Sequence, residues 1–294
     1  MDTLRVGAKV PNFGPLPTEL GVADMSARLE DVGFDSLWVS DHVVMPAVVE
    51  SRYPFAPDGK ANWATDAPWF DPIAMLGMMT AATTSVELGV AVLLLPMRHP
   101  VILAKQAASL DALSGGRLAL GVGAGWLAEE FEALNVPFDT RGRRLDEWME
   151  LARACWTGAP PAFDGAHYQL PAGVQCYPVP AHYIPFLLGG HSPAALRRAG
   201  TTGDGWLAQQ SARTIDFSAL DEGIRAMKAA AGGIGRDPED LRAVIRIAES
   251  ADVPELVAES FDSLVDIGAT EVIVDVDWAS DDGPERAAAT LLGR

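Results

Sequence analysis

An acid and an imidazole follow directly on a short apolar stretch near the N-terminus. Residues 33–46, "GFDSLWVSDHVVMP", have the pattern of a buried strand that ends in Asp41 and His42. At the carboxyl end of a parallel strand, a histidine can hydrogen-bond a developing anion or relay a proton, and a neighbouring acid can orient its ring. The structural alternatives are a His42 that satisfies backbone carbonyls and an Asp41 that caps the next turn. No H-x-H or H-E-x-x-H spacing predicts a metal site.

A glycine-rich segment follows a later apolar stretch. Residues 120–131, "LGVGAGWLAEEF", place Gly123, Ala124, Gly125 and Trp126 after a predicted strand. The spacing is G-x-G-x-G and not the G-x-G-x-x-G of dinucleotide-binding folds. Glycines at these positions would let the backbone approach a flat ligand closely, and a tight turn between strand and loop is the alternative.

A glycine pair precedes a predicted helix further along the chain. In residues 184–200, "IPFLLGGHSPAALRRAG", Gly189, Gly190 and His191 lie between a strand and a helix that starts near Pro193. Backbone amides at a helix N-terminus form an anion site that suits a phosphate. A short turn between strand and helix is the alternative. Arg98, in the loop after another strand, is expected to be solvated or paired with an acid.

Alternating strand-like and helix-like segments imply parallel strands joined by crossover helices. Eight strands are predicted, at residues 4–10, 36–40, 86–94, 117–122, 185–188, 205–208, 242–248 and 271–276. Helices are predicted at residues 18–32, 72–83, 101–113, 143–156 and 193–199, with N-caps at Asp71, Ser192 and Asp237. Eight such units favour one α/β domain over residues 1–294, a (β/α)8 TIM barrel, rather than a doubly wound open sheet.

Two long connections exceed the minimal barrel pattern. Residues 43–71 follow the second strand, and residues 157–184 follow the helix after the fourth strand; both contain proline and aromatic residues. Long loops at the carboxyl ends of barrel strands commonly build a binding site. The sequence therefore predicts that both insertions form the substrate pocket, and plain surface loops are the alternative. Trp63, Trp69 and Trp126 are candidate walls of that pocket, with a minor core role as the alternative.

Composition excludes several classes of protein. A hydrophobic share of 49% is typical of a globular chain, and 40 acidic against 22 basic residues give a net charge of −18, which repels nucleic acid and anionic membranes. Cys155 and Cys176 show no metal or redox spacing, so reduced thiols are expected. The first residues lack a signal-peptide pattern, and the longest apolar run is too short for a membrane span. We expect a cytoplasmic protein.

Most of the chain resembles the luciferase-like monooxygenase superfamily, and within it the oxidoreductases that depend on the deazaflavin coenzyme F420. The resemblance is carried by residues 33–46, by residues 88–144 and by residues 186–208. It implies a TIM barrel that binds a flavin or deazaflavin at the carboxyl ends of the strands, as a homodimer. It also implies hydride transfer between F420 and a small organic substrate.

The resemblance assigns roles to particular residues. His42 matches a histidine close to the reactive part of the ring, and Asp41 would orient that histidine. Ala91–Val92 matches a non-prolyl cis peptide behind the ring. The segment that lines the ring corresponds to Gly123, Ala124, Gly125 and Trp126, and the phosphate clamp corresponds to Gly189, Gly190 and His191.

The chain departs from the pattern of some F420-dependent dehydrogenases. Those proteins carry a glutamate as proton donor just after the glycines, where this chain has Trp126, and Glu129 and Glu130 lie too far along the presumed helix to replace it. The resemblance therefore favours a reductase or monooxygenase over a sugar-phosphate dehydrogenase. The first alternative is an FMN-dependent monooxygenase that uses oxygen and reduced flavin from a partner reductase. The second is a barrel that binds flavin without turnover.

Overall fold

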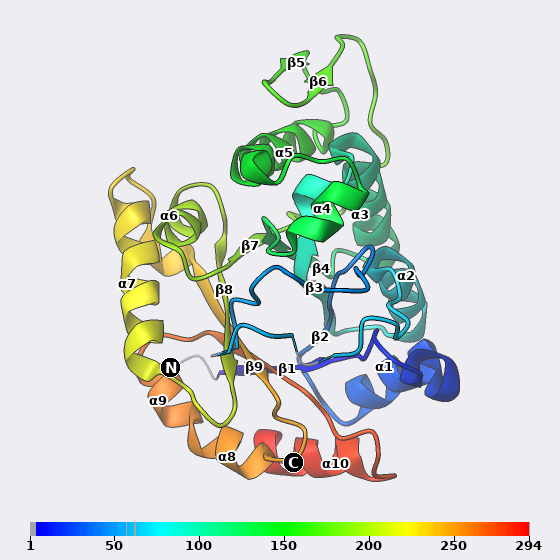
Figure 1. The fold of residues 1–294 in the computed structure, drawn as a ribbon, viewed down its shortest axis with the longest axis vertical. Coiled ribbons are helices and arrows are strands. Elements are labelled where there is room, and N and C mark those ends of the chain that lie inside the picture. Colours follow the sequence, from blue (N-terminus) through cyan, green and yellow to red (C-terminus); the bar gives the residue numbers. More distant parts are fainter. Residues whose placement is uncertain (1–3, 57, 62, 294) are drawn as a thin grey trace.

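Eight parallel strands close into a barrel in the computed structural model, which describes residues 4–56, 58–61 and 63–293 (Figure 1). The strands are β1 (Arg5–Lys9), β2 (Ser36–Val39), β3 (Glu87–Leu94), β4 (Leu118–Gly123), β7 (Phe186–Gly189), β8 (Gly205–Ser211), β9 (Arg242–Ala248) and β10 (Glu271–Val274). Their order is β1-β10-β9-β8-β7-β4-β3-β2, and β2 pairs again with β1. The eight predicted strands and the TIM-barrel class are confirmed, and closure of the sheet excludes the doubly wound alternative.

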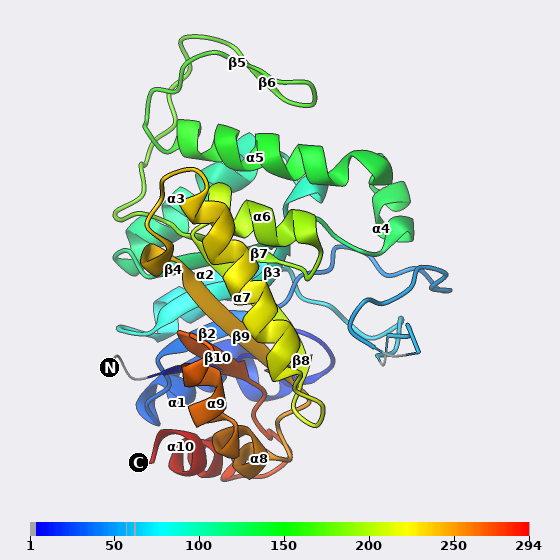
Figure 2. The ribbon, with the colours of Figure 1, turned by 90° about the vertical axis from the view of Figure 1, so that its left-hand side faces the viewer.

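Helices cover the outside of the barrel (Figure 2). They are α1 (Val22–Asp31), α2 (Pro72–Ala82), α3 (Pro100–Ser114), α4 (Ala128–Ala133), α5 (Arg141–Cys155), α6 (Pro193–Thr201), α7 (Phe217–Gly232), α8 (Pro254–Glu259), α9 (Phe261–Asp266) and α10 (Gly283–Leu292). None of the helices in the described ranges is long and apolar enough to cross a lipid bilayer. Cys155 and Cys176 are free thiols.

The predicted helix starts are confirmed in part. The Asp71 side chain accepts hydrogen bonds from two amides of α2, and the Ser192 hydroxyl accepts one from α6. Asp237 caps only a 3-10 turn, Pro238–Asp240. The helix predicted at residues 18–32 is divided, because Gly21, with φ of 82°, separates a π-helical turn (Pro17–Gly21) from α1.

A small apolar cluster packs the barrel interior. Its buried members are Trp38, Ala119, Leu187, Leu207, Val244 and Ile273. The Trp38 ring lies so close to β3 that a Cβ atom at Gly89 would stand 2.2 Å from it, which explains the glycine at that position. A much larger apolar cluster fills the space between the strands and the surrounding helices.

A buried carboxylate lies beside this interior cluster. Glu271 is fully buried, and its Oε1 accepts a hydrogen bond from Ser36 Oγ at 2.5 Å, while Oε2 accepts one from Arg242 Nη2 at 2.7 Å. Arg5 adds an ion pair at 3.2 Å. These four residues are the first residues of β10, β2, β9 and β1. Glu271 therefore joins the amino ends of four strands, opposite the end where a barrel carries its site.

Removal of this carboxylate is expected to destabilise the fold. Glu271→Ala should lower the free energy of unfolding by about 3–5 kcal/mol, because Arg242 and Ser36 lose a buried partner. Urea denaturation measures the change. The matched control is Glu239→Ala, which removes an exposed partner of Lys228 and should cost less than about 1 kcal/mol. Equal losses in the two variants would contradict the structural role of Glu271.

Candidate active site

Two adjoining cavities lie at the carboxyl ends of the strands. The first, which we name the His42 cavity, has a volume of about 1000 Å³ and is lined by His42, Trp63 and Arg246 among others. The second, the glycine cavity, measures about 1080 Å³ and is lined by residues of both glycine-rich segments: Gly123, Ala124, Gly125, Trp126, Gly189, Gly190 and His191. Val92 and Trp126 border both cavities. The structure therefore brings the two predicted glycine segments and His42 to one end of the barrel.

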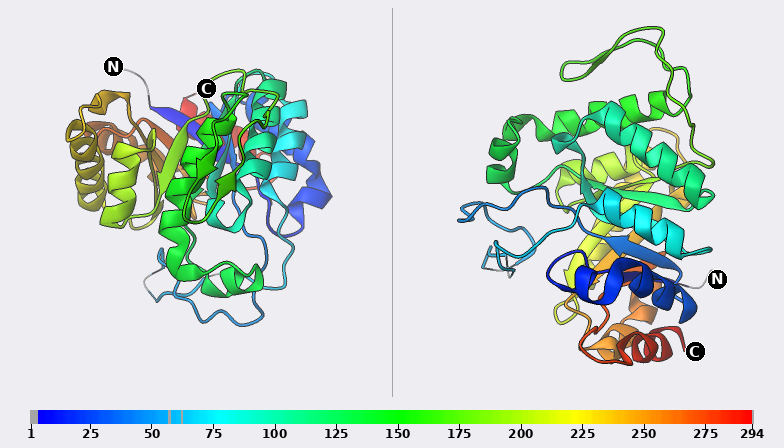
Figure 3. Two further views of the ribbon diagram at one scale, coloured as in Figure 1. Left: turned by 90° about the horizontal axis from the view of Figure 1, so that it is seen from above. Right: turned by 90° about the vertical axis from the view of Figure 1, so that its right-hand side faces the viewer.

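The two long insertions have different positions. The described residues of the first insertion, 43–56, 58–61 and 63–71, extend beside α4 at the carboxyl end of the barrel, whereas residues 157–184 project away with the small β5 (Phe163–Asp164) and β6 (Gln169–Leu170) hairpin (Figure 3). Among the described residues, none from 157–184 lines the His42 cavity or the glycine cavity. The prediction that both insertions form the pocket is wrong for residues 157–184. This segment joins α5 to the amino end of β7, and such a connection lies at the opposite face of the barrel.

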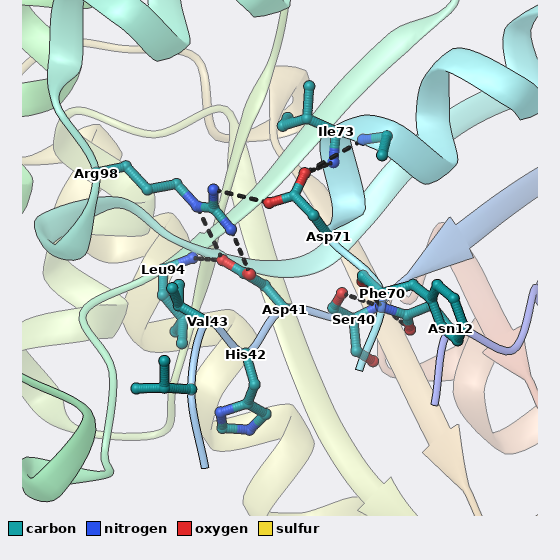
Figure 4. A network of polar contacts seen from close by, with 12 residues as sticks. Asn12, Ser40, Asp41, His42, Val43, Phe70, Asp71, Ile73, Leu94 and Arg98 are labelled. Carbon is teal, nitrogen blue, oxygen red and sulfur yellow. Dashed lines mark hydrogen bonds and ion pairs between the residues drawn. The ribbon is translucent and has the colours of Figure 1, made fainter. Parts of the chain in front are cut away.

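The Asp41 carboxylate joins the ends of β2 and β3 (Figure 4). It is buried and accepts hydrogen bonds from the Leu94 amide at 2.9 Å and from Arg98 Nη2 at 2.7 Å. Arg98 also pairs with Asp71, the N-cap of α2, at 3.1 Å. Burial raises the pKa of Asp41, and the Arg98 guanidinium opposes that rise. The default expectation that Arg98 pairs with an acid is confirmed.

Glu130, and not Asp41, contacts the His42 ring. The Glu130 carboxylate is buried, and its Oε2 lies 3.1 Å from His42 Nδ1. Its other oxygen accepts hydrogen bonds from the amides of Val43 and Val44. The expectation that Asp41 orients the imidazole is therefore corrected, because the Asp41 oxygens are occupied by Arg98 and Leu94.

The neighbouring glutamate anchors the insertion that follows His42. Glu129 Oε1 accepts the Ser51 amide at 2.8 Å, and Oε2 accepts the Ser51 hydroxyl at 2.6 Å. Burial would raise the pKa of Glu129, but these bonds and that from the Glu50 amide lower it to about 2. Glu129 and Glu130 of α4 thus hold the first part of the insertion, residues 43–51, in place. Glu130 reaches the site even though its place along the helix predicts otherwise.

Aromatic rings surround His42. Its ring centroid lies 4.8 Å from Trp69, 5.9 Å from Trp63 and 6.1 Å from Trp126. Tyr53 contacts Trp63 and Trp126, each at 5.1 Å, and its hydroxyl accepts a hydrogen bond from Gln209 at 2.9 Å. The indole nitrogens of Trp63 and Trp69 are buried without a hydrogen-bond partner in the described part of the chain. The three tryptophans therefore form a wall of the cavity.

β3 contains an irregular step whose Val92 lines both cavities. The Ala91–Val92 peptide is cis, as the resemblance implies, and the pairing of β3 with β4 shifts its register between Val90 and Leu93. The Val92 side chain occupies the space that two glycines leave open. A Cβ atom at Gly123 would lie 2.8 Å from Val92 Cγ2, and one at Gly189 would lie 2.9 Å from Val92 Cγ1. Both glycines are thus needed to accommodate this step.

Gly189 and Gly190 lie between β7 and α6. Gly190 has φ of 103°, a conformation that side chains rarely adopt, and His191 follows at the helix start. The backbone amide of Gln209 donates a hydrogen bond to His191 Nε2 at 3.2 Å. Nε2 is therefore the acceptor, and the ring proton lies on Nδ1. Burial lowers the pKa of His191 and so favours this neutral form. The helix start therefore offers both backbone and imidazole donors to an anion.

Asn12 is a site residue that sequence reasoning missed. Its amide nitrogen donates to the carbonyls of Ser40 at 2.7 Å and Phe70 at 3.0 Å, and its oxygen accepts the Ser40 amide at 3.0 Å (Figure 4). It thus joins the end of β1 to both ends of the insertion at residues 43–71. An asparagine after a strand is also common in ordinary turns, so its residue type carried no distinct signal.

Comparisons with known sequences agree with this architecture. The family model for luciferase-like monooxygenases matches residues 20–266. An uncharacterized protein of Mycobacterium tuberculosis is 38% identical over 183 residues, which span 62% of this chain and 63% of that protein. An F420-dependent glucose-6-phosphate dehydrogenase of Amycolatopsis mediterranei is 30% identical over 255 residues, 85% of this chain and 70% of that protein.

Solved structures share the fold. A structure described as an F420-dependent secondary alcohol dehydrogenase in complex with an F420-acetone adduct has a TM-score of 0.75 at 19% identity, with 99% of this chain and 98% of that chain covered. The oxygenating constituent of 3,6-diketocamphane monooxygenase of Pseudomonas putida, in complex with FMN, has a TM-score of 0.72 at 14% identity, with 98% and 97% covered. Because the family model matches most of the chain, this protein belongs to the luciferase-like monooxygenase family.

Proposed function

We propose that this protein is an F420-dependent oxidoreductase that transfers a hydride between the deazaflavin and a small organic substrate. The observation that carries the proposal is the junction of the two cavities at the Ala91–Val92 step. The glycine cavity contains hydrogen-bond donors that suit a phosphate, and the His42 cavity contains a histidine among aromatic rings. The relative at 30% identity, which covers most of the chain, is named for dependence on F420 and supports the same cofactor.

The residues present fit a phosphorylated, ring-bearing cofactor. The glycine cavity combines the α6 N-terminus with the neutral His191 donor, and both suit a phosphate. The absent side chains at Gly123 and Gly189 let backbone approach a flat ring beside Val92. Gly190, His191 and Ser192 would hold the phosphate, and Ala91, Val92 and the segment from Gly123 to Trp126 would line the ring. When bound, the deazaflavin supplies a ring carbon that takes up or releases hydride.

His42 is the proton-transfer residue in this proposal. A carboxylate only accepts hydrogen bonds, so the contact with Glu130 keeps the His42 proton on Nδ1. Nε2 then carries a lone pair for a ligand in the His42 cavity. The ring can accept a proton from a substrate hydroxyl or, once protonated, return one to a substrate oxygen. By the family resemblance, Trp126 stands where some F420-dependent dehydrogenases carry a glutamate as proton donor, and we therefore assign proton transfer to His42.

The three tryptophans around His42 have a separate role, which is to exclude water. Trp63, Trp69 and Trp126 surround the imidazole with apolar ring surface, and the adjoining insertion covers this side of the cavity. Exclusion of water strengthens each hydrogen bond that His42 makes with a reacting group.

The cofactor assignment is tested by titrating the purified protein with coenzyme F420 and, separately, with FMN, while ring fluorescence is followed. We expect saturable binding of F420 and weaker binding of FMN. Stronger binding of FMN would replace the proposal with the flavin-dependent monooxygenase alternative. Binding of neither cofactor would contradict the assignment of the glycine cavity.

The phosphate position is tested by Gly190→Ala. An alanine at φ of 103° is strained by roughly 1–2 kcal/mol, so affinity for F420 should fall about tenfold. Gly173→Ala is the matched control, because Gly173 also has a positive φ, of 82°, has open space around it and lies in the remote insertion. Its affinity for F420 should stay unchanged. Equal weakening by both substitutions would show that strain, and not the site, is responsible.

The role of Glu130 is tested by Glu130→Gln. The Gln side chain can present an amide N–H to Nδ1, which would move the ring proton to Nε2 and remove the lone pair that faces the cavity. We expect turnover to fall about a hundredfold, in the range of a lost general base, with little change in affinity for F420. Nitrogen-15 NMR of the His42 ring reads the tautomer directly. An unchanged tautomer together with full turnover would contradict this role.

A further inference from the structure

Lys9 is a cation of the His42 cavity that the proposed chemistry does not use. It is the last residue of β1, and it lines both the His42 cavity and a smaller cavity of about 130 Å³ beside Phe13 and Asp275. In the described ranges, no carboxylate oxygen lies within the 4.0 Å ion-pair distance of Lys9 Nζ. A desolvated ammonium without a carboxylate partner is costly for a protein to keep.

The nearest charges do not neutralise Lys9. Asp275 bonds to Arg246 Nη2 through one oxygen and accepts the Glu249 amide at 2.9 Å through the other. Arg246 is 7% exposed, and its Nη1 donates to the carbonyls of Ile247 and Ile273. Arg246 and Asp275 therefore pair with each other, and among the described residues Lys9 has no ion-pair partner of its own.

The ionisation of Lys9 reflects this environment. Burial and, to a smaller extent, the neighbouring Arg246 lower the pKa of Lys9 to about 8, against the opposing effect of Asp275. Besides Lys9, the charged and titratable groups around the same cavity come from the strand ends and from the insertion; they are Asp41, His42, Tyr53, Asp58, Lys60, Arg246, Glu249 and Asp275. A lysine of this kind is charged below about pH 8 and neutral above it.

Flat apolar surface lies next to this ammonium. Phe13 borders both cavities that Lys9 borders, and its ring packs on Trp69 with centroids 4.9 Å apart. Trp69 in turn contacts the His42 ring. A continuous run of rings thus leads from Lys9 to the proposed proton-transfer residue, as a planar ligand with one charged end would require.

We propose that Lys9 binds the carboxylate of the substrate, and that the substrate is therefore a planar aromatic or conjugated monocarboxylic acid. One ammonium without an ion-pair partner matches one negative charge, whereas a phosphate dianion would need further donors. A local cation is also required because the net charge of −18 repels anions at longer range. That this acid is the substrate rests on the proposed function, whereas the binding of a carboxylate at Lys9 does not depend on the cofactor.

The test measures carboxylate preference on the protein without added cofactor. Isothermal titration calorimetry compares benzoate, trans-cinnamate and 2-naphthoate with their neutral amides. We expect at least one acid to bind about tenfold tighter than its amide, in the range of a charge-assisted hydrogen bond. Lys9→Met should remove this preference, while the exposed control Lys228→Met should keep it. Thermal unfolding of each variant verifies that the fold is intact.

The pH profile separates Lys9 from the other charged groups. In the wild type, the carboxylate preference should decline as the pH rises through about 8, because Lys9 loses its proton. In Lys9→Arg the preference should persist to about pH 9.5, since an arginine stays charged. Two results would overturn the proposal: no acid of the three binds better than its amide, or the preference survives in Lys9→Met.

The same variants keep this inference separate from the cofactor proposal. F420 should bind Lys9→Met as well as it binds the wild type, because Lys9 does not line the glycine cavity. A carboxylate preference that depends on Lys9 would stand even if F420 failed to bind. Conversely, F420 binding without any carboxylate preference would leave the cofactor proposal intact and contradict the assignment of Lys9.

Discussion

The Asp41–Arg98 ion pair is the interaction on which the geometry of the site depends. Asp41 lies at the end of β2, accepts the Leu94 amide of β3, and binds the guanidinium that also reaches the N-cap of α2. The Arg98 carbonyl in turn accepts the Trp148 indole N–H of α5 at 3.2 Å. A buried ion pair of this kind is weak evidence for stability, because loss of solvation offsets its attraction. The ion pair instead fixes the position of the chain at the end of β2, and it thereby positions His42, which follows Asp41 directly.

Much of the fold could be predicted from the sequence because it depends on local patterns. Strands such as residues 242–248 are short apolar runs between polar turns, and helices such as α2 begin at an N-cap followed by proline. Eight alternations of this kind are compatible with few topologies. The division at Gly21 depends on a positive φ that the helical spacing of residues 18–32 does not reveal. The position of residues 157–184 follows from the order of the elements, because the segment joins α5 to the amino end of β7, and not from the aromatic composition on which the prediction was based.

The candidate site was predictable only where residue type and strand position coincide. His42 and the glycines satisfy both conditions. Glu130 does not, because an acid in the first turn of a helix is typical of solvent-exposed positions, and its partner lies 88 residues earlier in the chain. The choice of Glu130 over Asp41 is decided by which acid the Arg98 guanidinium occupies. That competition becomes visible only when β2, β3 and α4 are placed together.

The two cavities differ in the kind of group that forms them. The glycine cavity depends on absent side chains and on main-chain groups, whereas the His42 cavity is lined in part by side chains of the 43–71 insertion, including Tyr53, Trp63 and Trp69. Main-chain groups persist when side chains change, and the insertion is attached to the barrel through Glu129, Glu130 and Asn12 at a few defined points. Residues between those points can therefore change after a gene duplication while the insertion stays attached to the barrel. Barrels of this kind can therefore acquire new substrate specificities through single substitutions in the insertion, while each variant keeps the main-chain groups of the glycine cavity.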